Sequence, residues 1–116
     1  MTCIARRERS RRSSARSADL RQKIDALDEE LVRLLNARAA CALEIGSVKK
    51  TAGLPVYQPS RETEVLKHVQ SINPGPLDDA AVRRLFERII DEARRLERIA
   101  EGHVSEPESH ERKTPE

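Results

Sequence analysis

The stretch Leu34–Lys50, LLNARAACALEIGSVKK, decides how this chain folds. Two of its cations, Arg38 and Lys49, stand among apolar residues and lie eleven residues apart. Eleven residues make about three turns of a helix, so both side chains point to the same side of it. A helix that directs two positive charges along an apolar face needs either an escape to solvent for those charges or an anion that pairs with them.

The apolar pattern extends in both directions from this stretch. Its members recur at alternating steps of four and three residues, and this heptad pattern predicts a long helix packed against another helix. We expect the helix to begin near Asp19, whose carboxylate can cap it, and to end near Thr51, because Gly53 and Pro55 follow. The members of the pattern, one of them a cation, are Leu20, Ile24, Leu27, Leu31, Leu34, Arg38, Cys41, Ile45 and Val48.

Two shorter helices are expected after the long one. Pro59 suits a first helical position, and the second helix should continue to about Ser71. The loop NPGP separates it from a third helix, which Asp78 or Asp79 caps and which reaches about Ala100. No strand pattern and no internal repeat is present, so the sequence predicts an all-α fold with one long, one short and one medium helix. The expected apolar side of the third helix consists of Val82, Leu85, Phe86, Ile89, Ala93, Leu96 and Ala100.

Charge is distributed unevenly along the chain. Residues 1–18 carry six Arg and one Glu, residues 101–116 carry five Glu against one Arg and one Lys, and residues 19–100 hold fourteen bases and fourteen acids. We therefore predict a helical domain at 19–100 between a disordered Arg/Ser-rich N-terminal extension and a disordered acidic C-terminal tail. An organelle transit peptide and an RNA-binding arm are the other interpretations of residues 1–18.

Composition argues against several classes of protein. The two cysteines, Cys3 and Cys41, form no disulfide framework, which favours a reducing, cytoplasmic setting. No apolar run is long enough for a membrane span. The neutral segment 19–100 and the presence of only two aromatic residues, Tyr57 and Phe86, argue against binding to nucleic acid.

Three cations on one flank of the long helix, Arg21, Arg38 and Lys49, indicate a site shared between two chains. Arg21 and Lys49 are 28 residues apart, which is about 42 Å along a helix and too far for one small site in one chain. An antiparallel second copy would bring its Arg21 towards the other two cations, so we expect a symmetric homodimer. Two simpler readings stay open: each cation extends to solvent, or the heptad pattern serves dimerisation without any site.

Three further charged residues are candidates for such a site. Arg61 and Glu62 lie in the first turn of the second helix, where Glu interacts favourably with the helix dipole and Arg does not. Arg61 therefore indicates a pairing carboxylate or a ligand. Glu97 borders the apolar side of the third helix, where it either reaches solvent, pairs with Arg94, or acts as a partly buried acid with a raised pKa.

Short motifs run in a characteristic order through residues 19–98. They are Leu20-Arg21, Ile24-Asp25, Leu34-Leu35 followed by Arg38, Ile45-Gly46, Lys49, Pro55-Val56, Arg61-Glu62, Leu85-Phe86 and Ile89-Ile90. In this order and spacing, the segment resembles the all-helical chorismate mutases. The resemblance implies an intertwined antiparallel homodimer of three-helix chains, with one site at each end of the paired long helices. It also implies a rearrangement of chorismate to prephenate without cofactor or metal, in the branch of the shikimate pathway that leads to phenylalanine and tyrosine.

The resemblance implies how the substrate's carboxylates and its ether oxygen would be bound. Arg21 of the partner chain and Arg38 would hold the two carboxylates, and Lys49 would bond one carboxylate and the ether oxygen. Glu97 would lie opposite Lys49 across that oxygen and would donate a hydrogen bond to it while protonated. Ala93 stands where some relatives carry a hydroxyl residue that helps to bind a carboxylate, and Ala cannot do so.

The resemblance also implies how the ring hydroxyl would be bound. Glu62 and the backbone amide near Gln58 would take the hydroxyl, and Arg61 would complete the positive lining. Gln58 stands where relatives often carry Asp. Glu62 favours a mutase over an isochorismate pyruvate lyase, which is similar in fold. The remaining alternative is a weakly active helical dimer regulated by a partner enzyme of the shikimate pathway.

Overall fold

The computed structural model describes residues 2–55 and 58–102 of the 116-residue chain. It consists of two units, residues 1–37 and residues 38–116, and each unit is described by itself. The connector residues Val56 and Tyr57, and the predicted acidic tail from residue 103 onward, lie outside the described residues.

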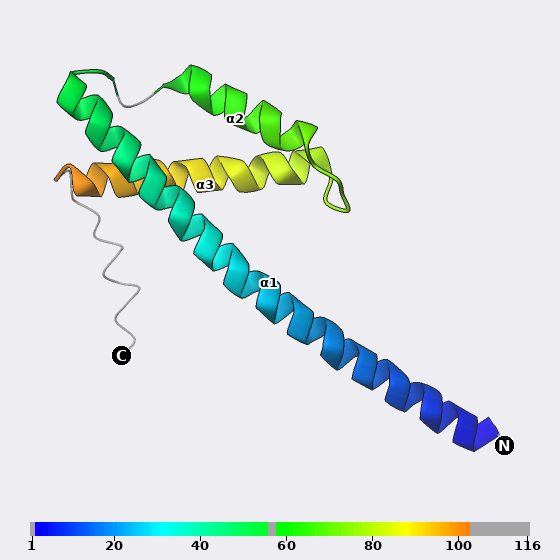
Figure 1. The fold of residues 1–116 in the computed structure, drawn as a ribbon. Helices are drawn as coiled ribbons and strands as arrows, with labels where there is room; N and C mark the ends of the chain where they lie inside the picture. The colour runs from blue at the N-terminus through cyan, green and yellow to red at the C-terminus, as the bar shows by residue number, and fades with distance from the viewer. Residues whose placement is uncertain (1, 56–57, 103–116) are drawn as a thin grey trace. The chain divides into compact units, whose positions relative to one another are not determined.

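Three helices make up the described part of the chain: α1 (Thr2–Ala52), α2 (Pro59–Ser71) and α3 (Asp79–Ala100) (Figure 1). The described residues contain no strand, and the all-α class is confirmed. None of the described helices is both long enough and apolar enough to cross a membrane.

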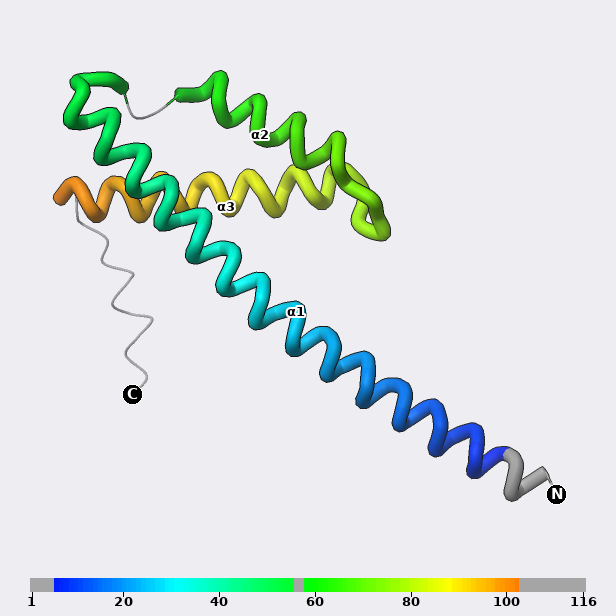
Figure 2. Tube along the Cα trace, viewed as in Figure 1, coloured from blue at the N-terminus to red at the C-terminus, as the bar shows by residue number. Residues whose placement is uncertain are grey.

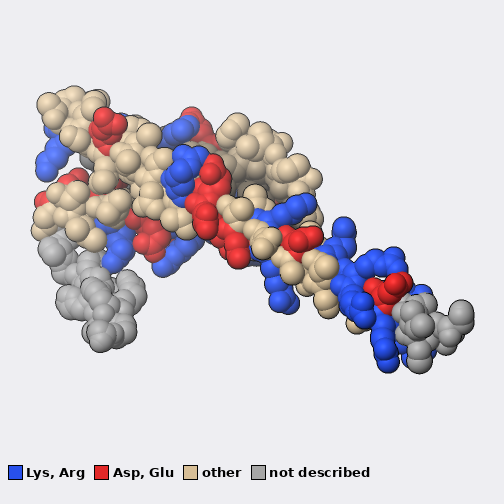
Figure 3. Space-filling view, turned by 60° about the horizontal axis from the view of Figure 1, so that its bottom comes forward, with Lys and Arg blue, Asp and Glu red and all other residues tan. Residues whose placement is uncertain are grey.

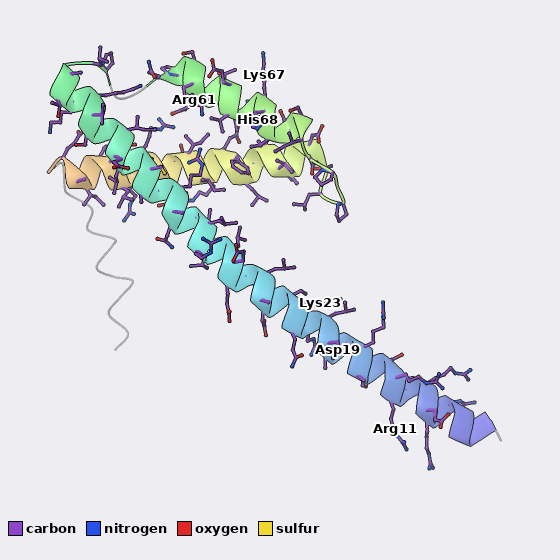
Figure 4. All side chains as sticks on the ribbon, in the orientation of Figure 1. Arg11, Asp19, Lys23, Arg61, Lys67 and His68 are labelled. Carbon is purple, nitrogen blue, oxygen red and sulfur yellow. The ribbon has the colours of Figure 1, made fainter. Side chains whose placement is uncertain are left out.

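The start of α1 differs from the prediction. The helix begins at Thr2, so the expected start at Asp19 is wrong; Asp19 lies exposed within the helix (Figure 4). The segment before Asp19 contains neither Gly nor Pro, and six of its residues are Arg, a good helix former. An ion pair of 3.6 Å between Glu8 and Arg12 spans one turn of it. Residues 2–18, expected to be disordered, are therefore helical in the structure, and Lys and Arg gather along this end of α1 (Figure 3).

The apolar heptad residues of the first unit are exposed. Leu27, for example, keeps 66% of its surface accessible. A helix with a continuous apolar row normally buries that row against another element, so this row is a surface suited to a second helix. The residues concerned are Leu20, Ile24, Leu27, Leu31 and Leu34.

The core of the second unit lies between α2 and α3. The two helices run antiparallel and side by side, and a short loop joins them (Figures 1 and 2). The buried residues between them are Leu66, Val69 and Ile90. The prediction for α3 included Leu85, which is exposed, and omitted Ile90. Adjacent apolar residues such as Ile89 and Ile90 fit one helical pattern equally well, so only the position of α2 decides which of them is buried.

The ends of the shorter helices follow from local chemistry. α2 begins at Pro59, as predicted, and α3 begins after Asp78, whose Oδ1 accepts a hydrogen bond of 2.7 Å from the Ala81 amide. α1 ends at Ala52, one residue beyond the expected end, and Gly53 follows with a φ of 75°. A positive φ favours glycine because it has no Cβ, so Gly53 ends the helix and starts the turn towards α2.

Candidate active site

A cavity of about 310 Å³ lies in the second unit, lined by side chains from all three helices. Its lining comes from the C-terminal part of α1, the start of α2 and the second half of α3. This volume is within the range of small-molecule sites. Of the eight residues that the sequence nominated, seven line this cavity: Arg38, Lys49, Gln58, Arg61, Glu62, Ala93 and Glu97. The eighth, Arg21, belongs to the first unit.

α1 contributes two cations to the cavity on one helical face. Arg38, Ala42, Ile45 and Lys49 follow one another at helical spacing, so their side chains lie along the same side of α1. Both cations are partly buried, whereas Lys50, which follows Lys49 directly, is exposed. The spacing in the sequence therefore places Arg38 and Lys49 on one face of α1, and this face lines the cavity.

Lys49 connects the end of α1 to the start of α2. Its Nζ donates a short hydrogen bond to the side-chain Oε1 of Gln58, the residue that precedes α2. The Gln58 backbone carbonyl accepts hydrogen bonds from the amides of Arg61, at 3.1 Å, and Glu62, at 3.3 Å. Gln58 thus organises the first turn of α2 through its backbone while its side chain holds the Lys49 ammonium.

The two charged residues in the first turn of α2 have different surroundings. Arg61 lies in the first turn of α2 (Figure 4) and lines the cavity, but its exposed guanidinium pairs with Glu64 at 3.2 Å, one turn along the same helix. Glu62 is partly buried, and its Oε2 lies 3.2 Å from Nε of Arg94 on α3. Arg94 also contacts Asp91 at 2.8 Å. Glu62 is therefore paired with a residue of α3, whereas Arg61 is paired with a residue of its own helix, α2.

Sequence reasoning missed Arg94 as a site residue and considered it only as a partner for Glu97. It lines the cavity together with Ile90 and Glu97, which lie four residues before it and three residues after it. This spacing places all three on one face of α3. The sequence spacing alone places Arg94 on this face of α3. The ion pair of Arg94 with Glu62, in contrast, depends on how α2 packs against α3.

The pKa of Glu97 is raised above its ordinary value. The main cause is burial, which disfavours the charged form, and the negative charge of Glu101 adds to it. Arg94 lowers the pKa, Glu62 raises it, and Lys49 lowers it, in decreasing order of effect. The sum favours a protonated carboxyl group that persists to higher pH and can donate a hydrogen bond into the cavity.

The arrangement is suited to binding a small anion. Four cationic side chains line the cavity against two carboxyl groups, and one of these has a raised pKa. No cluster of His, Cys, Asp and Glu that could hold a metal ion occurs in the described residues. Fixed cations in a partly buried cavity bind carboxylates or phosphates, and the guanidinium groups add directional donors.

The fold and the cavity together define an all-helical protein with a cation-lined cavity where its helices meet. The family model described as chorismate mutase type II matches residues 20–98. The chain belongs to this family.

Relatives and solved structures support this assignment. The chain is 47% identical over 83 residues to the bifunctional chorismate mutase/prephenate dehydratase of Pseudomonas aeruginosa, covering 67% of this chain and 23% of that protein. Chorismate mutase (form II) from Thermus thermophilus gives a TM-score of 0.69 at 39% identity, covering 71% of this chain and 93% of that one. Chorismate mutase from Helicobacter pylori, solved in complex with prephenate, gives 0.66 at 31% identity, covering 75% and 94%. The chain spans less than a quarter of the length of curated relatives such as the Pseudomonas protein and its counterpart in Neisseria gonorrhoeae.

Proposed function

We propose that this protein is a chorismate mutase, an isomerase that converts chorismate to prephenate by an intramolecular Claisen rearrangement. The observation that carries the proposal is the cavity that brings Arg38 and Lys49 of α1 together with Glu62 and Glu97. Membership of the family supports it, as does the Helicobacter pylori relative, whose structure holds prephenate. The reaction needs no proton transfer, and hence no general base, cofactor or metal.

Positioning of the substrate is the first part of the proposed mechanism. Chorismate carries two carboxylates, and cations at fixed positions would hold them so that the extended molecule adopts its compact, reactive conformer. Arg38 would hold one carboxylate, and Arg21 of a second chain would hold the other. Ala93 offers no hydroxyl for this purpose, so binding would depend on the cations.

Stabilisation of the ether oxygen is the second part. Negative charge grows on this oxygen as its bond to carbon breaks, and preorganised donors stabilise that charge. Lys49, held in place by Gln58, would donate from one side, and protonated Glu97 would donate from the other. The burial that raises the pKa of Glu97 supports this role.

A symmetric homodimer is part of the proposal. The exposed heptad row of α1 supports a second helix as its partner, because burying one Leu or Ile side chain contributes about 1.5–3 kcal/mol. The antiparallel arrangement would supply Arg21 to the site of the other chain. We place the enzyme in the cytoplasm, in the synthesis of phenylalanine and tyrosine, on the basis of its cysteine content and its family.

Loss of chorismate absorbance by the purified protein tests the proposal directly. We expect wild type to form prephenate, and Arg38→Ala and Lys49→Ala to lower kcat/KM by about 100-fold or more, because each removes a fixed charge at the reacting molecule. Lys50→Ala is the matched control, since Lys50 is the exposed neighbour of Lys49 and should leave turnover unchanged.

Isochorismate in a parallel assay separates the mutase from a lyase on the same fold. Release of pyruvate from isochorismate, without conversion of chorismate, would contradict the proposal. Turnover that becomes measurable only after another shikimate-pathway enzyme is added would instead indicate a regulated dimer.

A further inference from the structure

Arg94 is a cationic side chain of the cavity that the proposed mechanism leaves without a role. It follows Ala93 on α3 and is partly buried, and its Nε atom is removed from solvent. Burying even part of a guanidinium carries a cost, which nearby carboxylates offset. The position of Arg94 therefore has to be explained by its contacts.

Two carboxylates from different helices contact the Arg94 guanidinium. Asp91, three residues earlier on α3, lies 2.8 Å from Nη2, and Glu62 of α2 lies 3.2 Å from Nε. The pairs of Arg83 with Glu87 and of Arg88 with Glu92 each stay within one turn of α3. The pair of Arg94 with Glu62 joins two helices instead, and it does so at the cavity wall.

Glu62 presents an electrostatic difficulty that this pair resolves. A carboxylate in a cavity for a dianion repels the ligand, and the repulsion grows as water is excluded. A guanidinium in contact with one carboxylate oxygen compensates that charge. With Oε2 next to Arg94, Oε1 of Glu62 is left to accept a hydrogen bond from a ligand hydroxyl.

We propose that Arg94 is a positioning residue that orients Glu62 and compensates its charge, so that Glu62 can accept the ring hydroxyl of a dianionic substrate. The inference rests on the proposed function. It assigns Arg94 no contact with the reacting atoms, and it makes Asp91 the residue that steadies the guanidinium from its own helix.

A purely structural role predicts a different kinetic signature. If Arg94 merely braced α2 against α3, its loss would reduce the amount of folded enzyme, and the apparent kcat would fall at constant KM. A contact with a hydroxyl that persists from bound substrate to transition state contributes uniform binding, and losing it raises KM. The split between KM and kcat therefore distinguishes the two roles.

A double-mutant cycle tests the inference with Arg94→Leu, Glu62→Ala and the combination of both. We expect Arg94→Leu to lower kcat/KM for chorismate by about tenfold, mainly through KM. In the Glu62→Ala background, the same change should cost less than about twofold, because Arg94 acts through Glu62. Arg94→Lys should recover part of the loss, since it restores the charge without the planar fork.

Arg95→Leu is the matched control. Arg95 has similar exposure, pairs with a carboxylate three residues before it, Glu92 at 3.5 Å, and does not line the cavity. We expect its KM to equal that of wild type. If wild type is active and Arg94→Leu leaves kcat/KM unchanged, this inference alone is overturned. The same holds if Arg94→Leu causes its full loss of kcat/KM in the Glu62→Ala background as well. A wild type that does not convert chorismate overturns the proposed function, and this inference with it.

Discussion

Glu97 is a carboxyl group whose state of protonation depends on its surroundings. Burial and the charges of Glu101 and Glu62 raise its pKa, and the cations Arg94 and Lys49 only partly offset the rise. Below the pKa the group is a hydrogen-bond donor, and above it the group is an anion that faces a dianionic ligand. The proposed chemistry requires the first state.

We expect kcat/KM to fall as the pH rises through the raised pKa of Glu97, because the donor to the ether oxygen is lost and a repelling charge appears. Glu97→Gln should flatten this decline, since an amide donates at every pH. Rates measured across the acid and neutral range check the expectation, with Glu92→Gln, an exposed change on the same helix, as the control that keeps the decline. A pH profile for Glu97→Gln identical to that of wild type would remove Glu97 from the mechanism.

At the scale of the element, α1 combines an apolar row with cations at intervals along it. The apolar row is exposed in the first unit of the chain. Arg38 and Lys49 line the cavity in the second unit. We propose that α1 serves two purposes: its apolar residues suit a partner helix and its cations suit a ligand.

Leu27→Glu tests the first of these purposes. Placing a charge in the apolar row should shift the purified protein from dimer to monomer at micromolar concentration, and activity should fall with it because Arg21 no longer reaches a second chain. Sedimentation velocity gives the mass, and Glu29→Gln, which lies outside the row, should remain dimeric. A monomeric wild type, or a dimeric and fully active Leu27→Glu variant, contradicts the proposed assembly.

At the scale of the whole molecule, the proposed site divides its residues between two chains. The cavity lies in residues 38–116, and Arg21 lies in residues 1–37. If Arg21 comes from the partner, two variants that are each inactive can complement one another.

We expect a refolded equal mixture of Arg21→Ala and Arg38→Ala to regain about a quarter of wild-type activity, because about half of random dimers are mixed and each has one intact site. Each variant alone should be inactive. Mixing Arg38→Ala with Lys49→Ala is the control, since both changes lie on one side of the shared site and no intact site can form. Activity in the control, or none in the test mixture, contradicts a site built from two chains.

The limits of the sequence prediction follow from where the determining interactions lie. Gly53, Pro59 and Asp78 act on their own backbone neighbourhood, and the helix ends that they mark were predicted to within one residue. Asp19 was predicted to cap the first helix, as Asp78 caps the third, but Asp also occurs within helices. Because no Gly or Pro precedes Asp19, the helix continues back to Thr2.

The sequence alone determined the helical class, the two shorter helices and the side of α1 from which Arg38 and Lys49 project, because spacing along one helix settles which side chains share a face. Only the tertiary structure decided that Ile90 is buried, that Lys49 bonds Gln58 and that Arg94 pairs with Glu62. These contacts join segments whose relative position depends on how whole helices pack. No local pattern contains that information.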